Sequence, residues 1–386
     1  MALTANWNFP TAIRFGAGRV SELGDACRAA GITRPLLVTD PGVAPLDITV
    51  GALEAMAEAG LEAAVFSEVQ PNPTAANVTA GLAMLREGGH DGVVAFGGGS
   101  ALDAGKVIAF MRGQTRPMWD FEDVGDWWTR ADPAGIAPVV AVPTTAGTGS
   151  EVGRAGVITN VETHTKKVIF HPKMMPLQVI LDPELTVGLP PQITAGTGMD
   201  ALAHCLEAYC SPSYHPMAEG IAVEGIRLVK ENLLAAYQDG DDIEARANML
   251  AAAAMGATAF QKGLGAIHAL SHPVGAIYNT HHGLTNAVFM PYVMDFNREA
   301  VWDKMERLAG WLGIEGGYPG FLDFVLRLRR DLGIPHTIDR IGVDDGRFDE
   351  MADMAIVDPT AGGNPRPLKA HDARDLYEAA FEGRVA

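Results

Sequence analysis

The sequence predicts a two-domain protein, with an open, doubly wound parallel sheet of the α/β class in residues 1–187 and an all-α domain in residues 188–386. Two observations carry this prediction. In the first half, short apolar runs alternate with segments of helical periodicity, which is typical of βαβ units and a mainly parallel sheet. Beyond Asp182, a proline-punctuated stretch is followed by long segments rich in Ala, Leu and Met without a recognisable strand, so the boundary is expected near Val187.

The elements of the first half follow from their apolar patterns. Helices are expected at 21–30, 51–60, 75–89 and 101–113, and strands at 35–39, 61–69, 91–96 and 137–142. The segment from Trp119 to Pro138 contains three tryptophans, several aspartates and little periodicity, which predicts a loop. No internal repeat or low-complexity segment interrupts the chain.

Composition excludes several classes of function. The 386 residues include 29 Lys and Arg against 47 Asp and Glu, a net charge of -18, so nucleic acid is not an expected partner. The N-terminus lacks the pattern of a secretory signal, and no apolar run reaches the roughly 18 to 20 residues of a membrane span. Cys27, Cys205 and Cys210 are odd in number and form no disulfide framework, which favours a reducing, cytoplasmic location.

A run of three glycines, Gly97, Gly98 and Gly99, followed by Ser100, joins an expected strand to an expected helix. Glycine allows a sharp turn and the close approach of a ligand, and the free N–H groups at a helix start attract anions. The run therefore predicts a pyrophosphate cradle. It matches neither the G-x-G-x-x-G fingerprint, because Leu102 replaces the third glycine, nor a Walker loop. An ordinary strand-to-helix turn is the alternative.

Two further loops favour a nucleotide-binding site. Asp40 follows the strand expected at 35–39, where a carboxylate can bond an adenine-ribose diol and repel a 2′-phosphate, although it could equally be a turn aspartate before Pro41. The loop from Pro143 to Val152 offers the hydroxyl groups of Thr144, Thr145, Thr148 and Ser150, although an ordinary loop could have the same composition. Three such loops at strand ends point to one crevice, and hence to a dinucleotide-binding domain.

Histidines gather in the second half. Five of the 11 lie in two stretches, Gly198–Cys210 and Gly265–Ala287, among Ala, Gly and Leu. Asp200 and His204 are four residues apart, as are His268 and His272, so each pair shares a helix face. Imidazoles with a carboxylate suit Fe2+ or Zn2+, but spacing alone cannot choose among His268, His272, His281 and His282. The other histidines of polar or proline-rich loops are expected at the surface: His164, His171, His215, His336 and His371.

Four motifs together resemble one family. GGGSALDAGK, PTTAGTGSEV, GMDALAHCLEAY and HALSHPVGAIYNTHHGLTNA, in this order and spacing, are similar to those of the iron-containing (group III) alcohol dehydrogenases, and the resemblance runs from about Phe9 to the C-terminal helices. It implies an active site in the cleft between the two domains. It also implies that one divalent metal, Fe2+ with Zn2+ as the alternative, is bound by Asp200, His204, His268 and His282. His272 would lie near the nicotinamide and position substrate or pass protons.

The same resemblance implies a set of NAD-contacting residues. Together with Gly97 of the glycine run they are Asp40, Asn72, Gly98, Gly99, Ser100, Asp103, Thr144, Thr145, Thr148 and Lys167, with Asp40 at the position associated with NAD rather than NADP. The chain departs from the family pattern at Gly105, where relatives have Ala, and at His281. The glycine should loosen its helix by up to about 1 kcal/mol.

The expected activity is reversible hydride transfer between a small alcohol and NAD through a metal-bound alkoxide, by a homodimer that binds neither nucleic acid nor membrane. A glycerol-dehydrogenase-like or dehydroquinate-synthase-like enzyme shares this two-domain plan. A dehydroquinate-synthase-like enzyme needs several Lys and Arg side chains to bind its sugar-phosphate substrate. The stretch from Asp200 to His282 has only Arg227, Lys230, Arg246 and Lys262. A non-catalytic nucleotide-binding scaffold would leave the histidines unexplained.

Overall fold

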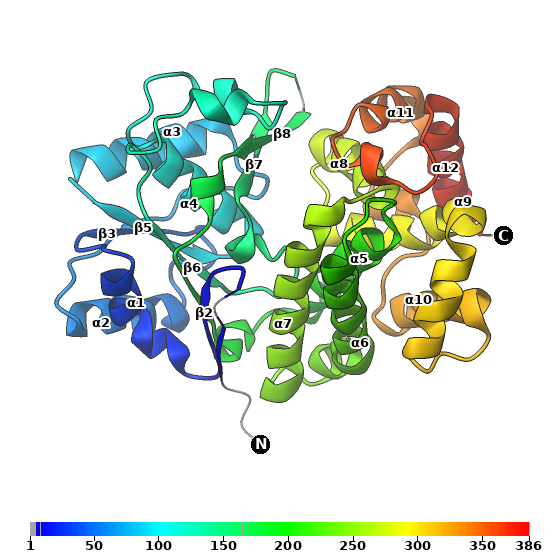
Figure 1. The fold of residues 1–386 in the computed structure, drawn as a ribbon, viewed down its shortest axis with the longest axis horizontal. Coiled ribbons are helices and arrows are strands. Elements are labelled where there is room, and N and C mark those ends of the chain that lie inside the picture. The colour runs from blue at the N-terminus through cyan, green and yellow to red at the C-terminus, as the bar shows by residue number, and fades with distance from the viewer. Residues whose placement is uncertain (1–4, 8, 164, 386) are drawn as a thin grey trace. The chain divides into compact units, whose positions relative to one another are not determined.

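The computed structural model describes residues 5–7, 9–163 and 165–385, and divides into two compact units, Met1–Gly188 and Leu189–Ala386. Figure 1 shows the first unit, in blue to green, as a sheet with helices, and the second, in green to red, as helices. The predicted fold class, a parallel-sheet α/β domain followed by a helical domain, is confirmed.

The sheet of the first unit has seven strands among the residues described, in the order β1-β2-β9-β6-β5-β3-β4. Only the edge strand β1 runs antiparallel to its neighbour. The bounds are β1 Ala5–Trp7, β2 Ala12–Phe15, β3 Pro35–Val38, β4 Ala64–Phe66, β5 Gly92–Gly97, β6 Val139–Pro143 and β9 Gln178–Leu181. The strands β3, β5 and β6 are buried throughout, which explains why each appears in the sequence as a continuous apolar run.

Helices cover both faces of this sheet. On one face, α1 (Leu23–Ala29) and α2 (Asp47–Glu58) share a buried cluster with β3, β5, β6 and β9. On the other, α4 (Gly99–Met111) packs against β5, with α3 (Ala75–Glu87) beside it. A Cβ atom placed on Gly105 of α4 would lie 2.8 Å from the Cβ of Ala95. Gly105 therefore allows the close approach of α4 to the sheet.

The order of the strands defines a switch point between β3 and β5. From β3 the chain continues to β4 on one side, and it then returns to β5 and proceeds through β6 to β9 on the other side. In open parallel sheets, ligands bind beyond the carboxyl ends of the strands at such a point. The residues that follow β3 and β5 are Asp40 and the glycine run.

Some strands of the first unit were not predicted. Besides β1, β2 and β9, the strands β7 (Ala155–Asn160) and β8 (Thr165–Phe170) form a separate antiparallel pair. Both strands are only partly buried and mix apolar with polar residues, so neither appears as a continuous apolar run. The segment from Trp119 to Pro138 is irregular, apart from the 3-10 turns Met118–Phe121 and Trp127–Arg130.

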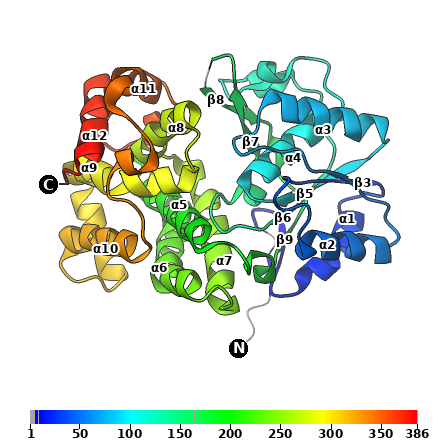
Figure 2. The same cartoon turned by 180° about the vertical axis from the view of Figure 1, so that it is seen from behind.

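The second unit is helical, with no strand in the described part of residues 189–385. Its helices are α5 Pro191–Cys210, α6 Pro216–Gln238, α7 Ile243–Ala259, α8 Ala266–Tyr278, α9 His282–Trp311, α10 Gly317–Asp331, α11 Phe348–Ile356 and α12 Ala370–Glu382. The central helix α5 packs against α6, α7 and α9, and Figure 2 shows it from behind. No described helix is long and apolar enough to cross a membrane.

Small residues let neighbouring helices approach α5 closely. A Cβ atom on Gly198 would lie 2.1 Å from Cδ1 of Leu233 in α6, and one on Gly256 of α7 would lie 3.0 Å from the Cβ of His204. The helix is buried from Thr194 to Tyr209. Polar side chains that α5 carries in this stretch are consequently held in the interior, where each needs a polar partner.

Candidate functional site

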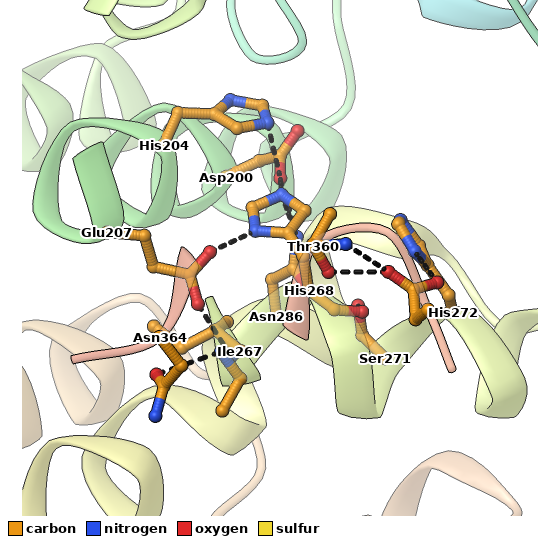
Figure 3. A network of polar contacts seen from close by, with 12 residues as sticks. Asp200, His204, Glu207, Ile267, His268, Ser271, His272, Asn286, Thr360 and Asn364 are labelled. Atoms are coloured by element: carbon orange, nitrogen blue, oxygen red, sulfur yellow. Dashed lines mark hydrogen bonds and ion pairs between the residues drawn. The ribbon is translucent and has the colours of Figure 1, made fainter. Parts of the chain in front are cut away.

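A buried cluster in the helical unit joins α5 to α8. Asp200 and His204 lie one turn apart on α5, and His268 comes from α8, with side chains that are almost completely buried. One possible ligand atom from each lies within 4.8 Å of the others, and Figure 3 shows the three side chains turned toward one another. A carboxylate in such surroundings requires positive charge or several donors.

The distances in this cluster suit one metal ion. The Oδ1 atom of Asp200 lies 3.9 Å from Nε2 of His204, 3.7 Å from Nε2 of His268 and 3.6 Å from Nε2 of His282. Two ligand atoms that each lie about 2.1 Å from one ion are separated by about 3.0 to 3.4 Å. The distance from Oδ1 of Asp200 to each Nε2 atom would shorten by about 0.5 Å around a bound ion. One carboxylate with three imidazoles is a donor set that fits Fe2+ or Zn2+.

Position on α9 separates the two adjacent histidines. His281 is the N-cap residue of this helix, and its Nδ1 accepts a hydrogen bond from the N–H of Leu284 at 3.2 Å. His282 is the first residue of the helix, and its ring lies 5.3 Å from that of His268. The structure thus brings His282 to Asp200 and uses His281 to begin the helix, a choice that spacing had left open.

Two residues of this site were missed from the sequence. Oε2 of Glu207 lies 2.5 Å from Nδ1 of His268, and Nδ2 of Asn286 lies 2.7 Å from Oδ1 of Asp200. The Asn286 nitrogen is also 3.1 Å from Nε2 of both His268 and His282. Helical spacing in the sequence could have identified both residues. Glu207 follows His204 by three residues and Asn286 follows His282 by four, so each shares a helix face with a predicted ligand.

Charge around His268 favours its protonated form in the absence of metal. Burial acts to lower its pKa, but the charge and hydrogen bond of Glu207, together with the charge of Asp200, outweigh burial and leave the pKa raised. The same negative charges attract a divalent cation, which would take the place of the proton at Nε2.

His272 lies beside the cluster, one turn after His268 on α8. Its Nδ1 is 2.8 Å from Oδ2 of Asp358, and its ring stacks on that of His282 with the ring centres 5.4 Å apart. The structure therefore places this histidine next to the predicted ligands, with one ring nitrogen already occupied by a carboxylate.

The glycine run of the α/β unit has the geometry of an anion site. The strand β5 ends at Gly97, with φ at 140°, and α4 begins at Gly99. A Cβ atom on Gly99 would lie 2.5 Å from Cγ2 of Thr148, and the N–H of Thr144 bonds the carbonyl of Gly97 at 2.9 Å. The run and the threonine loop thus form one surface at the carboxyl ends of β5 and β6.

Asp40 lies at the neighbouring strand end. Its Oδ1 accepts the N–H groups of Gly42 at 2.9 Å and Val43 at 3.0 Å. Its Oδ2 would lie 3.5 Å from a Cβ atom on Gly97. One carboxylate oxygen therefore shapes the turn after β3, and the other faces the glycine run at the switch point.

Comparison with known proteins decides the family. The family model "Iron-containing alcohol dehydrogenase" matches residues 10–183, and "Fe-containing alcohol dehydrogenase family, C-terminal" matches residues 194–381. The chain belongs to the iron-containing alcohol dehydrogenase family. This confirms the resemblance of the four motifs.

Similar relatives of this alcohol dehydrogenase cover almost the whole chain. A 4-hydroxybutyrate dehydrogenase of Cupriavidus necator is 40% identical over 96% of the chain and 98% of its own length. A 1,3-propanediol dehydrogenase of Klebsiella pneumoniae is 37% identical over 98% of each. The solved structure of a 1,3-propanediol oxidoreductase has a TM-score of 0.91 at 36% identity, covering 99% of this chain and all of its own.

Family membership establishes the activity in general terms. The protein is a metal-dependent, NAD-dependent alcohol dehydrogenase that acts on small-molecule alcohols, as predicted. The family uses NAD(H) and iron, and the buried aspartate and histidines suit such an ion. Neither a lyase of the dehydroquinate synthase type nor a non-catalytic scaffold is needed to explain the site.

Three further predicted cofactor residues of this dehydrogenase also have partners within the α/β unit. Asp103 accepts the hydroxyl of Ser150 at 2.5 Å and the N–H of Val157 at 2.9 Å, so it holds the threonine loop to β7. Lys167 on β8 forms an ion pair with Glu122 at 2.7 Å. Asn72 has a positive φ of 54°, and its carbonyl accepts the hydroxyl of Thr159. Their contact with NAD stays a prediction.

One expected surface histidine of the dehydrogenase is buried. His171 caps the 3-10 turn Pro172–Met174, accepting the N–H of Lys173 at 3.0 Å, and packs against Phe110 and Trp128. The surface prediction was wrong here because a proline-rich loop can fold back on the core when its histidine supplies a cap. His336 and His371 are exposed, His215 is half-buried, and His164 lies outside the described residues.

Proposed function

We propose that this enzyme interconverts linear primary alcohols and aldehydes with NAD at a metal held by Asp200, His204, His268 and His282. The observation that carries the proposal is the buried Oδ1 of Asp200 within 3.6 to 3.9 Å of three imidazole nitrogens. When bound, the metal supplies Lewis acidity, which lowers the pKa of a substrate hydroxyl or polarises a carbonyl.

The residues around the ligands hold them ready. The carboxylate of Glu207 accepts a hydrogen bond from the Nδ1–H group of His268, and this orientation directs the lone pair of Nε2 toward Asp200. The amide of Asn286 lies against Asp200, His268 and His282. A site organised before the metal arrives loses little freedom when the metal binds.

His272 is proposed as the proton-carrying group. During oxidation, the O–H bond of the alcohol breaks and the proton passes to an imidazole nitrogen of His272. The C–H bond of the carbon that carries this oxygen also breaks, and its hydride passes to the nicotinamide. Its place beside His282, with only 18% of the side chain exposed, supports contact with an alcohol at the ligand cluster.

NAD is proposed to bind at the switch point of the sheet. The N–H groups that follow Gly98 would hold the pyrophosphate, with the hydroxyls of Ser100, Thr144, Thr145 and Thr148 around it. Asp40 would accept the adenine-ribose diol and exclude a 2′-phosphate. The reaction requires the nicotinamide held by the first unit to reach the alcohol held by the second.

The substrate class is taken from the similar relatives. Two of them are named for 4-hydroxybutyrate and 1,3-propanediol, which are linear primary alcohols with a second polar group at the far end. We expect the chain to prefer alcohols of this kind, and the aldehydes derived from them, over branched or secondary alcohols.

A substrate panel tests this function. Protein purified without oxygen and loaded with Fe2+ is assayed for NADH formation with 1,3-propanediol, 4-hydroxybutyrate, ethanol, choline and 2-propanol. The highest kcat/KM is expected for one of the first two. No NADH from any alcohol would overturn the proposal, and a preference for 2-propanol, a secondary alcohol, would overturn the substrate class.

We also propose that the enzyme is a cytoplasmic homodimer. Its three cysteines, Cys27, Cys205 and Cys210, are free thiols, which supports a reducing compartment. The dimer rests on the family resemblance, and light scattering of the purified protein tests it. A mass equal to one chain of 40.8 kDa would contradict it.

A further inference from the structure

His272 is held by a carboxylate that comes from far along the chain. Its Nδ1 lies 2.8 Å from Oδ2 of Asp358, which follows α11, and the two side chains are only 18% and 9% exposed. A buried contact between charged or polar groups is stronger and better oriented than an exposed one.

The other oxygen of this carboxylate is occupied by Thr360. The backbone N–H of Thr360 donates to Oδ1 of Asp358 at 2.9 Å, and its hydroxyl donates to the same oxygen at 2.6 Å. Figure 3 labels His272 and Thr360, the two residues that contact Asp358. These two donors fix the plane of the carboxylate and leave Oδ2 for the imidazole.

An ionised carboxylate accepts hydrogen bonds and donates none. Burial acts to raise the pKa of Asp358, but its contact with His272 and the bonds from Thr360 outweigh burial and leave the pKa lowered. The group facing Nδ1 is therefore an acceptor, so Nδ1 carries a proton, and a neutral imidazole then has its lone pair on Nε2.

We propose that Asp358, with Thr360, is the positioning residue of His272, and that it holds this imidazole in the tautomer whose Nε2 accepts the substrate proton. The inference rests on the proton-carrying role given to His272 under the proposed function. When Nε2 takes the proton from the alcohol, the imidazolium that forms is paired with Asp358 across the 2.8 Å contact.

The substitution Asp358→Asn gives a sharp test because it keeps the size of the side chain. The two Thr360 donors would hold the amide oxygen in the place of Oδ1. The amide NH2 would then face Nδ1 of His272, which becomes an acceptor, and the imidazole proton moves to Nε2. We expect kcat for alcohol oxidation to fall by about 10² to 10⁴-fold, with the KM for NAD unchanged.

The tautomer is measured directly, without reference to activity. Full-length protein with 15N-labelled histidine, loaded with diamagnetic Zn2+, is examined by two-dimensional NMR, and the His272 signals are assigned by their loss in His272→Gln. We expect an Nδ1–H tautomer in the wild type and an Nε2–H tautomer in Asp358→Asn. The matched control is Asp353→Asn, an exposed aspartate of α11, which should change neither tautomer nor kcat.

The outcomes separate the two claims. An Nε2–H tautomer in the wild type would overturn the positioning role, and this result does not depend on whether Asp358→Asn folds. Wild-type kcat in an Asp358→Asn protein that keeps the Nδ1–H tautomer would overturn it as well. A reversed tautomer with unchanged kcat would support the positioning role and overturn the proton-carrying role of His272.

Discussion

Glu207 and His268 are joined by a buried contact of 2.5 Å between Oε2 and Nδ1. The other oxygen of Glu207 accepts the N–H of Ile267 at 2.6 Å, so the carboxylate is fixed at both ends. This contact determines which nitrogen of His268 faces Asp200. It extends the metal centre beyond the four proposed ligands to a residue that touches no metal.

Glu207→Gln should weaken metal binding by about 10 to 100-fold. The amide oxygen would stay on the N–H of Ile267, and the NH2 would face Nδ1 of His268, which places the imidazole proton on the ligating Nε2. Metal affinity is measured by competition with a chelator. Glu224→Gln, a half-exposed glutamate paired with Arg227 on α6, is the control and should bind metal as the wild type does.

Gly99→Ala should impair NAD binding. Its Cβ atom would lie 2.5 Å from Cγ2 and 2.9 Å from Oγ1 of Thr148, so the threonine loop must move away from the glycine run. A cost of about 1 to 3 kcal/mol corresponds to a rise in the KM for NAD of about 5 to 140-fold. Gly51→Ala on α2 meets nothing within 4 Å and should leave this KM unchanged. Equal KM values in both variants would show that the contact with Thr148 is unimportant.

Asp40→Asn should reduce the preference for NAD over NADP. The amide oxygen can still accept the N–H groups of Gly42 and Val43, so the turn is kept while the negative charge is removed. The ratio of kcat/KM for NAD to that for NADP is the quantity to measure, and we expect it to fall by about tenfold. Asp47→Asn at the start of α2 serves as the control. An unaltered ratio would remove Asp40 from cofactor selection.

Glu151→Gln should alter how stability depends on pH. Burial raises the pKa of Glu151 to about 7, against the opposing effects of a backbone hydrogen bond and of Lys106. The folded protein then binds a proton that the unfolded chain releases near pH 4.5, so wild-type stability falls as the pH rises from about 4.5 to about 7. The substitution removes this loss, which is on the order of 3 kcal/mol.

Melting temperatures at pH 5 and pH 8 measure the effect. The difference between Glu151→Gln and the wild type should be larger, in favour of the variant, at pH 8. Glu54→Gln, an exposed residue of α2, should give the same difference at both values. A smaller advantage of Glu151→Gln at pH 8 than at pH 5 would mean that Glu151 is ionised in the folded protein throughout this range.

Sequence predicted the parts of the fold that are most deeply buried. The strands at 35–38, 92–97 and 139–143 lie within two residues of the expected positions, because a strand buried on both faces is a continuous apolar run. The strands β7 and β8 escaped detection because they pair with each other, are only partly buried, and mix apolar residues with polar ones such as Lys167. Pairing of this kind leaves no mark in local periodicity.

The site was predicted in its residue types but not in its full geometry. Adjacent residues on a helix differ in direction by about 100°, so His281 and His282 cannot be told apart until the packing of α9 against α5 is known. For the same reason, spacing put Glu207 on the face of Asp200 without indicating that His268 lies opposite. Asp358 is 86 residues from His272 in sequence, and only the fold brings the two together.

The central claim is that one divalent metal is bound by Asp200, His204, His268 and His282. A crystal of the Fe2+-loaded protein, grown without oxygen and measured at the iron absorption edge, tests it with one anomalous difference map. We predict a single strong peak per chain, about 2.0 to 2.3 Å from Oδ1 of Asp200 and from Nε2 of each of the three histidines. A peak bound by His272 or His281 in place of His282, or no peak at this cluster in active enzyme, would contradict the account.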